Sequence, residues 1–381
     1  MSILRIGKVE TTEPTDARRP WEVETRIPKP DTGEYGYLSG NTLVPLSREA
    51  LMRFVGHSDS PPLVWTPEAD ILVPPWEVPY LWEAMRAKME EPELGRFHFA
   101  AGASILLTIF CAVLDLRFGA FAAVLLTPWV LYVRHNARKP KTAPTLEQMR
   151  AAAQATRHST WTHSRPAPYT RAFEIMLIAV GAVQFFFMES SVEAGALDAG
   201  PIAAGEWWRV GTCIVLHGGT WHFLMNFSAL KGLGRLVEAH APRAWLPVVF
   251  LLTALAGSAA SLLLPPYGRS VGASGGLMGM IGFLAVLGFR RRAHLPEGFG
   301  KLMLQNIGYT ALLGVVGFLF IDNAAHAGGL VAGALIGALV IPRETPLEAW
   351  TEGPALRVAG LACAGVVALL ATAAVGLTFF R

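Results

Sequence analysis

The chain has 381 residues, of which 52% are hydrophobic and only 16% charged, and its mean hydropathy is +0.39. Soluble domains usually carry about 25% charged residues, so this composition excludes an ordinary soluble globular protein and favours one that lies mostly in lipid. The net charge of +3 gives no reason to expect nucleic acid as a partner, because membrane proteins carry a basic excess on one side.

Residues 1–96 form the first predicted region. They alternate prolines, charges and aromatic residues, and no apolar run among them is long enough to cross a bilayer. The sequence therefore predicts an extramembrane N-terminal region, with amphipathic helices at 47–55 and 78–96 and prolines breaking the rest. It contains no catalytic motif, and its role stays open.

Apolar runs at 97–114 and 118–133 follow, separated by a short polar turn, and they predict a transmembrane helical hairpin over 97–133. Residues 134–171 are polar and basic and predict a cytoplasmic linker. Further apolar runs indicate seven more spans, so that nine are expected in all. These later runs lie at 172–188, 211–230, 244–264, 274–289, 301–321, 326–341 and 355–379.

The positions of Lys and Arg predict the orientation, because these residues accumulate in cytoplasmic loops. With the N-terminus inside, the inside connections after the hairpin carry 17 basic residues and the outside connections carry four. We therefore expect a multi-pass integral membrane protein with a cytoplasmic N-terminus, in a bacterial inner (plasma) membrane. The three cysteines, Cys111, Cys213 and Cys363, lie far apart in apolar runs, so free buried thiols are expected.

A serine flanked by glycines opens one of these runs, in the segment Gly-Ala-Ser-Gly-Gly at 272–276. A serine at a helix N-terminus lies among unpaired backbone N–H groups and the positive end of the dipole, where an oxyanion would be stabilised. Ser274 is therefore a candidate nucleophile. On this segment alone an ordinary N-cap in a glycine-rich packing helix is the commoner explanation, because Gly-x-Ser-Gly is a weak pattern.

His326 stands at the start of another apolar run, and ionisable residues at membrane depth are rare unless they are functional. The charge count places Ser274 and His326 at the outside ends of their helices, so they lie at one predicted depth and could hydrogen-bond directly. His326 would take the serine proton on attack and return it to the leaving amine. Two sets of small residues would let these helices pack closely: Gly275 and Gly279 on one, and Ala325, Gly329, Gly333 and Gly337 on the other.

His222 and Asn226 are four residues apart and so share a helix face. Both can donate hydrogen bonds, and with the Ser274 backbone N–H they could surround an oxyanion. His217 lies five residues before His222, about 140° around a helix, so joint metal ligation is unfavourable and His217 is interpreted as a structural hydrogen-bonding residue. No His-Glu-x-x-His or Gly-x-Gly-Asp motif occurs, so we expect no metal and no cofactor.

Taken together, these pieces resemble the rhomboid family of intramembrane serine proteases. Each motif is weak alone, but their order and common topology make the signal specific over roughly residues 172–341. The matching motifs are Trp208-Arg209 in the first outside loop, His222-x-x-x-Asn226, Gly272-Ala273-Ser274-Gly275, and Ala325-His326 followed by Gly329 and Gly333.

The resemblance implies an all-α polytopic fold: a six-helix core at 172–341 and an additional seventh helix within 342–381, preceded by the N-terminal region, hairpin and linker. It implies a catalytic dyad of Ser274 and His326 without a third acidic member, and oxyanion donors at His222, Asn226 and the main chain. Trp208-Arg209 is then a structural loop element. The implied partners are transmembrane protein substrates and the lipid bilayer, with no nucleic acid.

Two other functions remain open at this point. A non-catalytic rhomboid-like protein would bind or escort membrane clients, but such proteins typically lack the serine or the histidine, and this chain has both. A transporter is the third possibility, although no inverted repeat and no intramembrane acidic pair is evident. The resemblance favours an enzyme.

Overall fold

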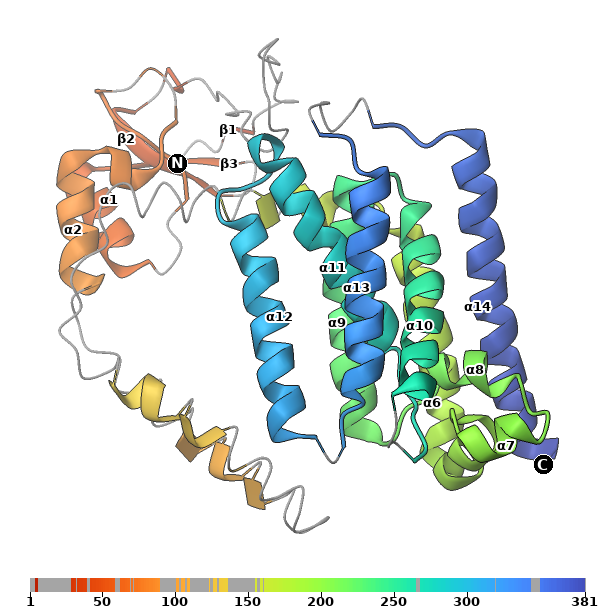
Figure 1. Ribbon diagram of the computed structural model, residues 1–381. Coiled ribbons are helices and arrows are strands. Elements are labelled where there is room, and N and C mark those ends of the chain that lie inside the picture. The colour runs from red at the N-terminus through yellow and green to blue at the C-terminus, as the bar shows by residue number, and fades with distance from the viewer. Residues whose placement is uncertain are drawn as a thin grey trace. The chain divides into compact units, whose positions relative to one another are not determined.

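The computed structural model describes residues 4–5, 29–89, parts of 101–135 and 155–164, and 165–380, with short gaps at 32, 40–41, 59–61, 69, 71, 265–267, 319 and 344–349. The chain forms two compact units, Met1–Thr156 and Arg157–Arg381. The two units are described separately, and Figure 1 labels their elements.

The first unit contains a four-stranded antiparallel sheet, which corrects the all-α expectation for this region. Its strands are β1 (Leu4–Arg5), β2 (Tyr35–Ser39), β3 (Thr42–Leu46) and β4 (Val64–Trp65), in the order β1-β3-β2-β4. Tyr35 pairs with Leu46 and Ser39 with Thr42 across a tight hairpin. Such short strands depend on cross-strand packing more than on local preference, so their sequences gave little signal alone.

Two helices and a short 3-10 turn (Pro75–Glu77) accompany this sheet. Helix α1 runs over Arg48–His57, and the Ser47 side chain caps it by accepting from the Ala50 N–H. Helix α2 runs over Pro79–Met89, and residues 90–96 of the predicted helix lie outside the described residues. The two helices share a buried core with the sheet, made by Leu51, Val55, Val64, Val78, Leu81 and Met85.

The predicted hairpin at 97–133 is described only in part. The described residues within 101–109 and 123–135 are helical, and the predicted turn at 115–117 lies outside the described residues. Whether these two arms cross the membrane stays a prediction.

The described part of the second unit contains seven long helices. Four of them, α6, α10, α13 and α14, are long and apolar enough to cross a membrane; that the other three also cross it stays a prediction. The seven are α6 (Pro168–Gly195), α9 (Thr220–His240), α10 (Trp245–Leu263), α11 (Ser274–Arg290), α12 (Phe299–Val316), α13 (Asn323–Val340) and α14 (Pro354–Phe380).

Helix α11 lies at the centre of this unit. It packs against α9, α10, α12 and α13 (Figure 1), and nearly all of its side chains are buried. Helix α14 packs on α6 and α10, and its Gly360 lies against Ala244. The central helix is therefore the one that begins at Ser274.

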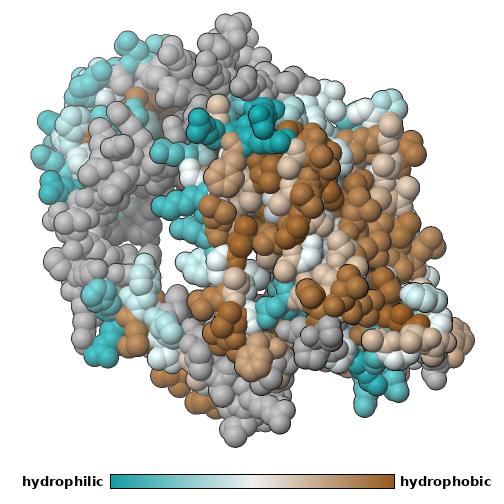
Figure 2. All heavy atoms as spheres, viewed as in Figure 1, coloured by the Kyte–Doolittle hydropathy of each residue, from teal (hydrophilic) through white to brown (hydrophobic). Residues whose placement is uncertain are grey.

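The outer helices bury their small residues and expose their large apolar ones. In α13, Gly329, Gly333 and Gly337 are buried, whereas Val331, Leu335 and Leu339 are 57%, 59% and 84% exposed. Figure 2 shows hydrophobic side chains gathered over the helices of this unit. Large apolar residues facing outward are typical of helices surrounded by lipid tails, which supports a multi-pass membrane protein.

One predicted span is displaced along the chain. The run 211–230 was expected to be a single helix, but α9 begins only at Thr220 and continues to His240. Before it, α8 (Arg209–Thr212) and a 3-10 turn (Cys213–Val215) form part of a loop. The chain turns at Gly219, which has φ +152°, a conformation that glycine adopts without a Cβ clash.

The described cysteines agree only in part with the expectation of free buried thiols, because Cys213 is buried but Cys363 is half-buried. Cys213 and Cys363 are free thiols, and the Cys213 sulfur lies 3.4 Å from the Ser258 hydroxyl. Cys111 lies outside the described residues.

Candidate active site

Ser274 is the first residue of α11. Ala273 precedes it and provides no side-chain cap, and the first hydrogen bond of the helix runs from the Leu277 N–H to the Ala273 carbonyl. The N–H groups at residues 274–276 therefore have no partner within the helix. The half-buried Ser274 side chain lies beside donors that an anion can use.

Helices α11 and α13 meet through their backbones. A Cβ added to Gly329 would collide with the Gly275 carbonyl oxygen, and one added to Gly333 would collide with the Gly279 carbonyl oxygen. This confirms the predicted contact between the two small-residue faces. Because the contact lies one residue after Ser274, it fixes how closely this residue approaches the first turn of α13.

His326 lies in that first turn and is half-buried. The carbonyl oxygen of Ala325, the residue before it, lies 3.6 Å from the Cβ position of Gly275. The backbones next to Ser274 and His326 therefore meet near the first turns of α11 and α13. In the described part of the chain, His326 Nδ1 is buried without a hydrogen-bond partner, and no hydrogen bond joins its ring to Ser274. The direct Ser274–His326 contact stays a prediction.

His222 approaches Gly272 in the loop just before Ser274 (residues 268–273, the serine loop). A Cβ built on Gly272 would lie 2.9 Å from His222 Nε2 and 3.5 Å from Ser274 Oγ. Gly272 has φ +139°, a backbone conformation that favours glycine. The absence of a side chain at this position thus lets the imidazole and the hydroxyl approach one common point.

A backbone contact determines which nitrogen of His222 can donate. The Gly218 N–H donates to His222 Nδ1 at 3.3 Å, so Nδ1 acts as the acceptor. In a neutral imidazole the proton is then on Nε2. The nitrogen nearest the Gly272 loop is therefore a hydrogen-bond donor.

Asn226 lies one turn further along α9 and is 4% exposed. Its Nδ2 donates to the His222 carbonyl at 2.9 Å, which places the two residues on one face, as their spacing predicted. The amide nitrogen carries two hydrogens, so one N–H remains for another acceptor. Its geometry is compatible with an oxyanion donor, and this role stays a proposal.

His217 differs from the expectation. It lies in the turn before α9 and not on the helix, so the argument from helical spacing was wrong: its ring stands edge-on to that of His222, with centroids 5.4 Å apart. Gln184 holds its backbone through hydrogen bonds of 2.9 and 3.0 Å. The ring nitrogens have no hydrogen-bond partner among the described residues, and no cluster of three metal-ligating side chains occurs there.

The Trp208-Arg209 pair folds back on the first loop. Trp208 Nε1 donates to the Ala194 carbonyl at 3.3 Å. Arg209 is buried, donates to the Ala196 carbonyl at 3.0 Å and pairs with Glu206 at 2.6 Å. These contacts join the pair to the last turn of α6 and to neighbouring loop residues, which supports a structural role for this pair.

Asp322 was missed by the sequence reasoning. It caps α13 and accepts hydrogen bonds from Ser261 and Ser270. An acidic residue directly before an apolar helix is a recognisable N-cap signal, but nothing in the sequence indicated its two serine partners.

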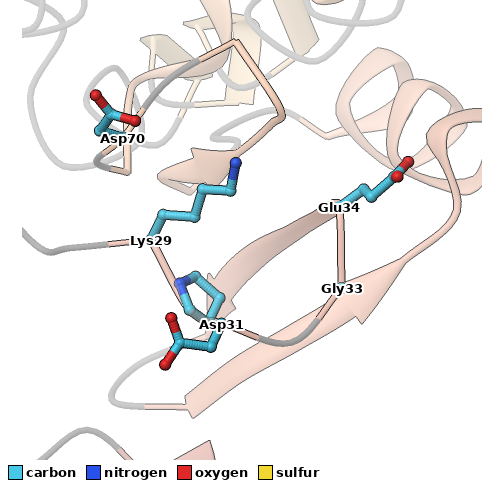
Figure 3. A pocket seen from close by; sticks show the side chains of 6 residues that line it. Lys29, Asp31, Gly33, Glu34 and Asp70 are labelled. Carbon is cyan, nitrogen blue, oxygen red and sulfur yellow. The ribbon is translucent and has the colours of Figure 1, made fainter.

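A polar hollow in the first unit is a weaker candidate. Lys29, Asp31, Gly33, Glu34 and Asp70 line it, together with Pro30. In Figure 3 the side chains of Asp31, Glu34 and Asp70 point in different directions, so they do not converge on one ion. The hollow holds no constellation that supports chemistry.

The comparisons with known proteins agree with this geometry. Residues 204–343 match the family model for the rhomboid domain, a stretch that contains Trp208, His222, Asn226, Ser274 and His326. The chain is 34% identical over 182 residues to the rhomboid protease GluP of Bacillus subtilis. This chain carries a rhomboid domain. It is also 33% identical over 161 residues to RHOMBOID-like protein 5 of Arabidopsis thaliana.

These similarities cover only part of each rhomboid. The matches span 44% and 39% of this chain, and 34% of GluP and 49% of RHOMBOID-like protein 5. A shorter relative, the putative rhomboid protease YdcA of Bacillus subtilis, is covered over 72% of its length at 26% identity. The chain thus matches about a third of the length of GluP and about half of the length of RHOMBOID-like protein 5.

Proposed function

We propose that this rhomboid is an intramembrane serine endopeptidase that cleaves peptide bonds in or near transmembrane segments of other membrane proteins. Ser274 is the proposed nucleophile, His326 the proposed base, and His222 and Asn226 the proposed oxyanion donors. The similarity to proteins named rhomboid proteases supports this class of activity. The observation that carries the proposal is the convergence of His222 and Ser274 at Gly272.

In the proposed reaction, Ser274 Oγ bonds to the substrate carbonyl carbon while its proton passes to His326. The carbonyl oxygen becomes an oxyanion, which accepts hydrogen bonds from the Ser274 main-chain N–H, His222 Nε2–H and Asn226. Collapse breaks the C–N bond, and the leaving amine takes the proton from His326. Water then attacks the acyl-enzyme with the same histidine as base, which restores Ser274.

The acid-base pair needs no third acidic residue in this proposal. Both carboxylate oxygens of Asp322 bind groups other than the His326 ring. His326 would therefore be oriented by its place in α13 and by the backbone packing of α11 against α13. We also propose the orientation deduced from the charges, with the N-terminus in the cytoplasm and the site toward the outside.

The test is cleavage of a model transmembrane substrate by purified protein in detergent, with Ser274→Ala and His326→Ala prepared in parallel. We expect cleavage by the wild type alone, and covalent labelling of Ser274 by a fluorophosphonate. Equal cleavage by all three proteins would contradict the dyad. Client capture without cleavage by the wild type would point instead to the non-catalytic, client-binding function.

A further inference from the structure

Asp322 controls the first turn of α13. Its side chain accepts from the Ala325 N–H at 2.9 Å, and its backbone carbonyl accepts from the His326 N–H at 3.1 Å. One residue therefore fixes the helix start that carries His326. Helix α11 has no such cap, because Ala273 precedes it.

The other carboxylate oxygen of Asp322 binds two serine hydroxyls from different elements. Ser261, in the last turn of α10, donates at 2.5 Å, and Ser270, in the loop before α11, donates at 2.7 Å. Hydrogen bonds to an ionised carboxylate are short and roughly twice as strong as neutral ones. Asp322 thus joins α10, the serine loop and α13.

Ser270 lies four residues before Ser274, just as Asp322 lies four before His326. Its backbone exchanges two hydrogen bonds with Leu197 of the first loop, at 2.9 and 3.0 Å, and further along the Gly272 N–H donates to the Cys213 carbonyl at 2.9 Å. The segment leading to Ser274 is therefore held along its length. The Ser270–Asp322 bond links this segment to the helix of His326.

The two kinds of contact between the serine and histidine segments restrict different movements. The glycine contacts of α11 and α13 limit how closely the helix axes approach each other. A carbonyl oxygen that faces a glycine makes no directional hydrogen bond against sliding along those axes. The hydrogen bonds of Asp322 oppose that sliding, because they connect the two segments ahead of their catalytic residues.

From this geometry we infer that Asp322 is a positioning residue, which sets the register of Ser274 relative to His326 through Ser270. This inference rests on the proposed function, since it assumes that these two residues react together. Asp322 touches no reacting atom: its oxygens are bound to Ser261, Ser270 and the Ala325 N–H. Misplacement by about 1 Å can cost about 100-fold in rate, so such a device has a measurable effect.

The test compares Asp322→Ala, Asp322→Asn and Ser270→Ala by kcat and KM on a model substrate, by the rate of fluorophosphonate labelling and by thermal unfolding. For Asp322→Ala we expect kcat and the labelling rate to fall together by about 100-fold with KM within about twofold. Asp322→Asn keeps the cap through its carbonyl oxygen and should lose less. Ser270→Ala keeps the whole cap, and its kcat should fall about 10-fold. The double variant Ser270→Ala/Asp322→Ala should be no slower than Asp322→Ala, since both changes remove the same Ser270–Asp322 hydrogen bond.

Ser47→Ala is the control, because Ser47 is also an N-cap, of α1 in the first unit, and accepts from the Ala50 N–H at 3.2 Å. It should stay within about twofold of the wild type. Equal losses in Ser47→Ala and Asp322→Ala, or a folded Asp322→Ala with unchanged kcat, would overturn the inference.

Should Asp322→Ala not fold, Ser270→Ala decides the question, since wild-type kcat and labelling in that variant overturn the inference. Failure of the proposed function has a different signature, namely cleavage by Ser274→Ala equal to that of the wild type. That result needs no Asp322 variant and would overturn both proposals together.

Discussion

Gly275 and Gly329 touch through their backbones, with the Gly275 carbonyl oxygen occupying the place where a Gly329 Cβ would be. Side chains keep most helix pairs about 8–10 Å apart. At this contact neither residue contributes one, so the helices carrying Ser274 and His326 pack as closely as their backbones allow. Several measurable consequences depend on this contact and on the loop at Gly272.

Gly329→Ala should separate α11 from α13. The added methyl group meets backbone atoms that have no rotamer to adopt, and overpacking of this kind typically costs about 1–3 kcal/mol. We expect a lower unfolding temperature and reduced cleavage. Gly308→Ala in α12 is the control, because nothing lies within 4 Å of its Cβ position; equal effects of the two variants would argue against the contact.

Gly272→Ala should damage the site more than the fold. Its Cβ would press on His222 at 2.8–2.9 Å, and alanine is strained at φ +139°. We expect about 10- to 100-fold slower cleavage. Displacing an oxyanion donor should lower the rate less than removing it, which typically costs about 100- to 1000-fold. Gly268→Ala, in the same loop with open space around it, should cleave normally. A normal rate in Gly272→Ala would remove the main support for His222 in the site.

His222→Ala and Asn226→Ala should each lower kcat by about 100- to 1000-fold, the usual cost of losing one oxyanion donor. KM should change little, because the donors act on charge that develops in the transition state. Steady-state kinetics on the transmembrane substrate measure both constants. Leu224→Ala, at an exposed position on the same helix, serves as the control. A rise in KM with kcat preserved would indicate substrate binding instead.

Glu238 should stabilise the fold without taking part in catalysis. Its carboxylate accepts from the N–H groups of Tyr169 and Thr170, at 3.0 and 2.8 Å, and from the Thr170 hydroxyl at 2.5 Å. Glu238→Ala leaves buried donors unpaired, at a cost of about 1–3 kcal/mol. Thermal unfolding should show the loss, while kcat at low temperature stays near that of the wild type. Exposed Glu297→Ala should show no change in either.

His158 makes a pH-dependent contact with His240, the last residue of α9, in the second unit. Its Nε2 lies 2.8 Å from His240 Nε2, so one ring donates and the other accepts. Burial lowers the pKa of His158 from 6.5 to about 4. A lowered histidine pKa means that the neutral form is favoured in the folded state, so this contact is fully stable above pH 6.5 and weakens as the pH falls toward 4.

Amide hydrogen exchange at residues 161–164 measures this contact. We expect protection to fall between pH 6.5 and 4 beyond the change in intrinsic exchange rate. In His158→Phe the protection should no longer depend on pH in this range. Constant protection of the wild type across the range would show that the histidine pair does not hold this segment.

Sequence patterns were most informative where they are long and repetitive. The apolar runs of the second unit predicted its long helices, because about 20 apolar residues have few stable arrangements other than a helix. Glycines at intervals of four predicted the α11–α13 contact, since they mark one helix face. The first unit was harder: strands of two to five residues are stabilised by partners distant in sequence, so the sheet at Tyr35–Ser39 went unpredicted.

For this chain the sequence by itself determined the membrane class, the long helices and the candidate residues Ser274, His326, His222 and Asn226. Only the tertiary structure decided how the segments between those helices fold. It placed His217 in a turn beside His222, brought the His222 ring to Gly272, and joined Asp322 to Ser261 and Ser270. The physical reason is that helix periodicity is local, whereas a loop's hydrogen-bond partners come from elements far along the chain, where no spacing rule applies.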